Sequence, residues 1–76
     1  MSSDLPVLDG KTVIAILEKA GFEEVRVRGS HHIMKKPGHR FLISVPVHSG
    51  RTLAPGTFRN ILRAAGLNSE AVRLLL

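Results

Sequence analysis

Two adjacent histidines, His31 and His32, follow a Gly29-Ser30 break that separates two short runs with the character of β-strands. Because an unperturbed imidazole titrates near pH ~6.5, a histidine can take up or release a proton close to neutral pH. Successive strand residues point to opposite faces, so a regular strand presents only one of the two imidazoles on a given face. A slip of one residue at the turn would exchange them. Both therefore stay candidate catalytic residues, and we favour His31.

The histidine pair lies in a window of the chain that carries no carboxylate side chain. All six acidic residues lie within positions 4–24 or at position 70, whereas eleven Lys and Arg bring the net charge to +5. A one-sided basic surface is typical of a protein that binds a phosphate-rich partner. Four cations flank the turn on the neighbouring strand runs and are expected to form a positive rim around the histidines: Arg26, Arg28, Lys35 and Lys36.

Other polar residues could add phosphate contacts. Ser30 stands in the turn itself, and His48 follows the third strand run, where it could bind phosphate or act as an acid. The alternative for His48 is a loop histidine that only bonds to the backbone. Thr57 and Arg59 lie in the first turn of an expected helix, whose free amides can bind a phosphate, although simple capping explains the same pattern. His39 is interpreted as ordinary surface.

The composition speaks against a metal or cofactor site. The chain has no cysteine, and its four histidines stand where acidic residues are missing, so the ligand set for a closed tetrahedral metal site is poor. A chain of this size buries only about 60% of its unfolded surface, which leaves little room for a deep pocket. The start, Met1-Ser2-Ser3-Asp4, lacks the features of a signal peptide, and no apolar run approaches roughly 18 residues. We expect one cytoplasmic domain over residues 1–76, without metal, cofactor or membrane segment.

Amphipathic helices are expected on either side of the strand runs. Asp9 is a suitable N-cap for a helix over about 10–20, in which apolar residues recur at helical spacing up to a stop at Gly21. Pro55 suits the first position of a second helix, which should end at Gly66 in the same way.

Three runs are expected as strands: residues 24–28, 31–36 and 41–47. In the first of them Val25 and Val27 alternate with charged residues and are expected to point inward. Short turns between sequential strands favour an antiparallel meander, with the apolar faces of both helices on one side and the other side open. The sequence thus predicts an α+β fold of the order α-β-β-β-α, with a short extra helix capped by Asn68.

Several stretches, in order and over roughly Leu8 to Leu67, are similar to the HicA toxin family: Gly21-Phe22, Gly29-Ser30-His31-His32-Ile33, Val45-Pro46-Val47-His48, Leu53-Ala54-Pro55-Gly56-Thr57-Phe58-Arg59-Asn60-Ile61-Leu62 and Ala65-Gly66-Leu67. The resemblance implies a fold like a double-stranded-RNA-binding domain and an RNA-cleaving toxin, an mRNA interferase of a type II toxin–antitoxin system. It implies a catalytic histidine in the Gly-Ser-His motif, here His31 or His32. It also implies a HicB-type antitoxin that covers the active face. Met34 departs from the family, in which an aromatic residue often stands at this position.

Residues and resemblance together favour a metal-independent RNA endonuclease. A histidine would take the proton of the 2′-hydroxyl, while Lys and Arg stabilise the phosphate. The alternatives are a non-catalytic double-stranded-RNA-binding-like module and a domain whose basic face binds an acidic protein. Phe22, Phe41 and Phe58 are expected in the core, so recognition through the RNA backbone and shape is favoured over base stacking. A His31→Ala change should separate these readings, because only a nuclease would lose cleavage while keeping RNA binding.

Overall fold

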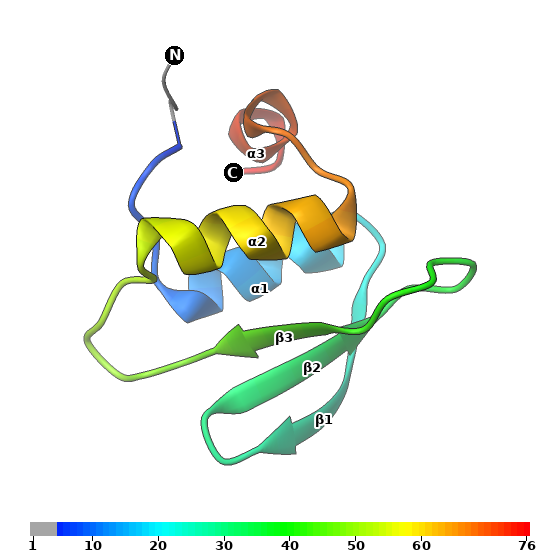
Figure 1. Ribbon diagram of the computed structural model, residues 1–76, viewed down its shortest axis with the longest axis horizontal. Coiled ribbons are helices and arrows are strands. Elements are labelled where there is room, and N and C mark those ends of the chain that lie inside the picture. Colours follow the sequence, from blue (N-terminus) through cyan, green and yellow to red (C-terminus); the bar gives the residue numbers. More distant parts are fainter. Residues whose placement is uncertain (1–4) are drawn as a thin grey trace.

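The computed structural model describes residues 5–76, so the expectation placed on Met1-Ser2-Ser3-Asp4 lies outside the described residues. Helices and strands follow one another along the chain (Figure 1) as α1 Gly10–Lys19, β1 Glu23–Arg28, β2 His31–Lys35, β3 Ile43–Pro46, α2 Pro55–Ala65 and α3 Ser69–Leu75. The strands form one antiparallel sheet in the order β1-β2-β3. The α+β fold predicted from the sequence is confirmed.

The ends of α1 lie where the sequence indicates. The Asp9 carboxylate accepts a hydrogen bond from the Thr12 amide at 2.9 Å, which satisfies one of the free N–H groups of the first turn. At the other end Gly21 has a φ of 103°, and the Phe22 amide donates to the Leu17 carbonyl at 2.9 Å. This bond closes a Schellman-type end and brings the buried Phe22 back towards the helix.

α2 and α3 obey the same local rules. α2 begins at Pro55 and stops at Gly66, which has a φ of 75°. The Leu67 amide then donates to the Leu62 carbonyl at 2.9 Å, and Asn68 caps α3 with its side chain, as expected. Within residues 5–76, no helix combines the length and the apolar character that crossing a membrane would require.

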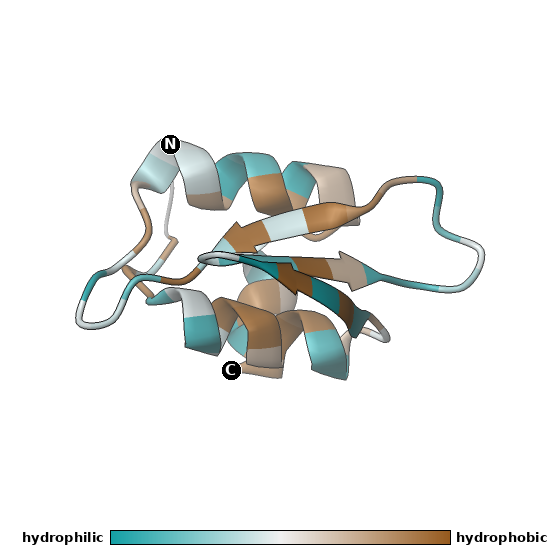
Figure 2. Cartoon of the chain, turned by 90° about the horizontal axis from the view of Figure 1, so that it is seen from below, coloured by the Kyte–Doolittle hydropathy of each residue, from teal (hydrophilic) through white to brown (hydrophobic). Residues whose placement is uncertain are grey.

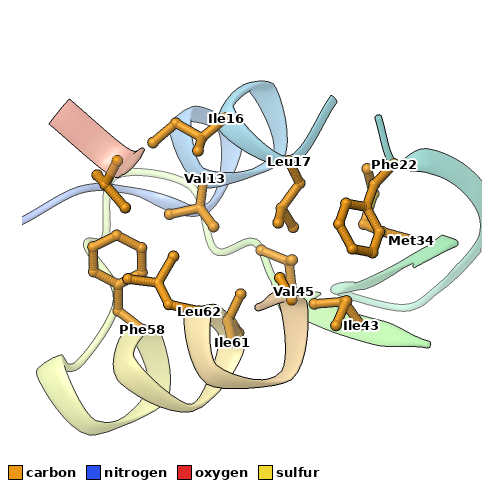
Figure 3. Packing of buried hydrophobic residues seen from close by; sticks show 12 residues of the cluster. Val13, Ile16, Leu17, Phe22, Met34, Ile43, Val45, Phe58, Ile61 and Leu62 are labelled. Carbon is orange, nitrogen blue, oxygen red and sulfur yellow. The ribbon is translucent and has the colours of Figure 1, made fainter. Parts of the chain in front are cut away.

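α1 and α2 cover the same face of the sheet (Figures 1 and 2). The core between them consists of Val13, Ile16, Leu17, Phe22, Met34, Ile43, Val45, Phe58, Ile61, Leu62, Ala65 and Val72. The strands contribute only Met34, Ile43 and Val45, and Figure 3 shows these three side chains meeting those of the helices. The core therefore rests on β2 and β3, and the opposite face of the sheet is left open.

β1 contributes no buried side chain. Val25 and Val27 were expected to point inward, but they are 52% and 48% exposed, so neither belongs to the core. A β-bulge between Glu24 and Arg26 leaves Val25 without a partner on β2. Beyond the bulge Val27 pairs with His32 on the helix-facing side, but at an edge strand that the helices leave half exposed.

β3 begins only at Ile43, two residues later than the predicted strand. The His39 Nε2 donates to the carbonyl oxygen of Ala64 at 2.7 Å, a C-terminal carbonyl of α2 that lacks a partner within the helix. The same ring meets Phe22 edge-on at 5.2 Å and Phe41 at 6.1 Å between centroids. His39 is thus half-buried rather than ordinary surface, and Phe41, expected in the core, is 55% exposed beside it.

Candidate nucleic-acid interface

A two-residue turn carries the histidine pair. Arg28 pairs with His31 across it, so Gly29 and Ser30 are its central residues. Gly29 has a φ of 58° whereas Ser30 does not have a positive φ, which is the pattern of a type II′ hairpin turn. The Val47 amide donates to the Ser30 carbonyl at 2.7 Å. This bond ties the turn to the chain that leaves β3.

The pairing of β2 with β3 decides which imidazole lies on which face. Met34 lies opposite Ile43, His32 lies opposite Val45, and the valine, the isoleucine and the methionine are all buried against the helices. Because neighbouring strand residues alternate, His31 stands on the open face of the sheet and His32 on the helix-facing side. The strand pairing therefore decides which of the two histidines lies on the open face, which the sequence had left undecided.

His31 has one side-chain neighbour that the sequence reasoning missed as a site residue. Its Nδ1 lies 3.1 Å from the Oγ of Ser44, an exposed residue of β3 on the same face. Within residues 5–76, the other ring nitrogen, Nε2, makes no hydrogen bond. The alternation along β3 already indicated an open-face position for Ser44. Its distance from His31 depends on a strand register that the sequence does not contain.

His32 has a different environment. Its Nδ1 lies 2.6 Å from Oε1 of Glu24, and the side chains are 25% and 37% exposed. The contact joins β1 to β2 next to the bulge, on the side of the sheet that faces the helices. The two imidazoles therefore differ in their partners as well as in their faces: a carboxylate for His32 and a hydroxyl for His31.

Three of the four rim cations share the open face with His31. Arg28 lies directly opposite His31 and Arg26 opposite Ile33, while Lys35 follows them by the alternation along β2. Beside them is a shallow hollow lined by Val25, Arg26, Arg28, Ile33 and Leu42. The amine of Lys36, in contrast, lies 5.6 Å from the ring centroid of Phe22, a cation–π contact outside this face.

The remaining predicted contacts lie around the margin of the sheet. His48 is exposed one residue after Val47, so it stands at the same end of the sheet as Ser30, in a hollow beside the N-terminus of α1. Thr57 lines a groove between α2 and the free edge of β3 that also includes Ser44. Arg59 is exposed on another side of α2 and does not line that groove.

Within residues 5–76, the open face brings together the imidazole of His31, the hydroxyl of Ser44 and the cations Arg26, Arg28 and Lys35. Such a set can exchange a proton and hold the charge of a phosphate. In the part of the chain that the structure describes, no three His, Asp or Glu side chains gather closely enough to hold a metal ion.

Comparison with known proteins gives one match, to a family model. None of the curated proteins compared with the chain matches it. The family model described as HicA toxin of bacterial toxin–antitoxin matches residues 10–67, from the first residue of α1 to just beyond α2. This match covers well over half of the sequence and contains the turn, both histidines and every cation of the open face. The chain therefore belongs to the HicA toxin family of bacterial toxin–antitoxin systems.

Proposed function

We propose that this toxin is an RNA endonuclease, an mRNA interferase, in which His31 is the catalytic base. The observation that carries the proposal is the place of His31 on an open, basic sheet face, with an Nε2 that makes no hydrogen bond within residues 5–76. A cytoplasmic location fits the proposal, since messenger RNA is found there. The whole chain, residues 1–76, would act as one nuclease domain.

The chemistry assigned to these residues is an internal transesterification. The Nε2 of His31 takes the proton of a ribose 2′-hydroxyl, and the 2′-oxygen forms a bond to the adjacent phosphorus. The bond from phosphorus to the 5′-oxygen breaks, and that oxygen takes a proton from an acid, for which His48 at the same end of the sheet is the candidate. The products are a cyclic phosphate and a free 5′-hydroxyl. No metal enters these steps, so cleavage should persist in a chelator.

The cations on the open face would hold the reacting phosphate. Arg26, Arg28 and Lys35 can bind the backbone and stabilise the charge that grows on the phosphate oxygens. Ser30 and Thr57 would add polar contacts at the turn and at the β3 edge. Lys36, Arg59 and His32, which lie away from this face, would contribute less to RNA binding.

A HicB-type antitoxin would neutralise the toxin by covering the same face. Val25 and Leu42 are 52% and 61% exposed there, among the arginines of the hollow. Exposed apolar side chains between cations fit a partner that offers both apolar and acidic groups. RNA and antitoxin would then compete for one surface.

The test compares His31→Ala with His32→Ala in a purified, folded protein. Single-turnover cleavage of an RNA in chelator should fall by about 10²–10⁴-fold for His31→Ala, while His32→Ala keeps measurable cleavage. Circular dichroism and RNA binding at several salt concentrations serve as controls for fold and affinity. Wild-type cleavage by His31→Ala would refute the assignment. A wild-type protein that binds RNA but leaves it intact would instead support a non-catalytic RNA-binding module, the second candidate, which the same cations favour.

A further inference from the structure

We propose that Ser44 is a positioning residue: its hydroxyl accepts the Nδ1–H of His31 and so keeps the Nε2 lone pair on the open face. The inference rests on the proposed function, in which that lone pair takes the proton of the 2′-hydroxyl. It assigns a role to a strand residue that stands thirteen positions from the histidine in the sequence.

The sheet itself sets the distance between the two side chains. Ser44 pairs with Ile33, two residues along β2 from His31, so the serine is the diagonal neighbour of the histidine on one face. The register of this strand pair is fixed on the opposite face by the buried pair Met34 and Ile43. The 3.1 Å contact is therefore a product of the core and not of the conformation of a loop.

A neutral imidazole has two tautomers. One ring nitrogen carries the proton and the other accepts, and the hydrogen bond at one nitrogen selects the form. A ring with its proton on Nε2 cannot act as a base there. An acceptor at Nδ1 favours the opposite form, which leaves Nε2 as the acceptor.

The hydrogen bond between His31 and Ser44 becomes stronger during the reaction. Once Nε2 has taken a proton, both ring nitrogens are donors, so Nδ1 then needs an acceptor. A serine hydroxyl can rotate to accept, and a hydrogen bond from a charged donor is stronger than one between neutral groups. In residues 5–76 no other side chain bonds to this ring, and the carboxylate of Glu24 is engaged with His32 on the other side of the sheet.

Two variants and one control test the proposal. Ser44→Ala removes the hydroxyl, Ser44→Thr keeps it in a residue that suits a strand, and Ser49→Ala removes a hydroxyl from an exposed turn after β3. The first readout is the imidazole ¹⁵N spectrum of the labelled protein at a pH where His31 is neutral. Wild-type protein and Ser44→Thr should show the proton on Nδ1, and Ser44→Ala should shift the ring towards the form with the proton on Nε2.

The second readout is the single-turnover cleavage rate. Loss of one hydrogen bond of net value about 0.5–1.5 kcal/mol corresponds to a fall of roughly 2- to 12-fold for Ser44→Ala, with unchanged RNA affinity. Ser44→Thr should restore the rate, and Ser49→Ala should leave it unaltered. If Ser44 only supported the fold, Ser44→Ala would instead lower thermal stability and RNA affinity together with the cleavage rate.

The outcomes separate this inference from the proposed function. A wild-type ring with its proton on Nε2, or a tautomer that Ser44→Ala does not change, overturns the role of Ser44. The role also fails if wild-type protein cleaves RNA and Ser44→Ala cleaves it equally fast, although the nuclease then stands. If wild-type protein cleaves no RNA, the nuclease proposal fails even where the ¹⁵N spectra show the expected contact.

Discussion

Replacing Gly10 by alanine should destabilise the protein, although alanine is the better helix former. Gly10 is the first residue of α1 and is buried against the end of β3. A Cβ atom at this position would lie 2.4 Å from the Pro46 carbonyl oxygen and 2.9 Å from Cγ2 of Val47. The valine methyl can rotate away, but the carbonyl belongs to the backbone and can only move together with the strand.

The size of the effect follows from two opposing contributions. Overpacking a tight site typically costs about 1–3 kcal/mol. Alanine in place of glycine returns at most ~1 kcal/mol of helix propensity. Taking the middle of the overpacking range, about 2 kcal/mol, the net loss in the free energy of unfolding is about 1–2 kcal/mol. In a domain of this size this corresponds to a fall of roughly 4–16 °C in Tm.

Gly56→Ala is the matched control. Gly56 also lies in the first turn of a helix, α2, but a Cβ there meets no atom within 4 Å. The change should leave stability unaltered or raise it by up to ~1 kcal/mol. Thermal and urea unfolding of both variants measure the difference. If Gly10→Ala proves as stable as the wild type, or both variants lose the same amount, the close approach of α1 to β3 is wrong.

Three further predictions concern single contacts. His39→Ala removes the hydrogen bond to the Ala64 carbonyl and should lower the free energy of unfolding by about 1–2 kcal/mol in urea titrations. Hydrogen bonds from the side chain and the amide of Thr12 hold the pKa of the Asp9 carboxyl below its ordinary value. The contribution of this cap to the free energy of unfolding is therefore complete above about pH 4, and it is lost as the pH falls through the lowered pKa. Asp9→Asn, which caps without ionising, should therefore flatten the acid limb of a stability-against-pH curve. Arg28→Gln should reduce the slope of log affinity for RNA against log salt by about 1.

The elements that the sequence predicts well are those controlled by nearby residues. The Asp9 cap acts on an amide three positions away, and the stops at Gly21 and Gly66 depend on bonds that span five residues. Such signals are complete within one stretch of sequence, because a helix end must satisfy its own free groups. The helices and the turn at Gly29 were therefore predictable to within a residue or two.

The features that escaped prediction depend on contacts between distant parts of the chain. His39 looks like a turn residue, and only the fold brings the end of α2 to its ring. Phe41 looks like a core residue, but it precedes β3 and lies exposed, edge-on to the ring of His39. Ser44 gains its significance solely from the strand register that sets it beside His31.

The bulge in β1 leaves the faces of the two histidines unchanged, although it displaces a valine that was expected to point inward. Val25 was expected inward, and the bulge displaces it from the regular pairing. Beyond the bulge, however, Val27 still pairs with His32, and His32 in turn pairs with the buried Val45. The faces of β2 are thus fixed by its partner in the core, β3, and not by the edge strand. β1 can therefore bend at its bulge and carry its arginines over the open face, while His31 remains the imidazole on that face.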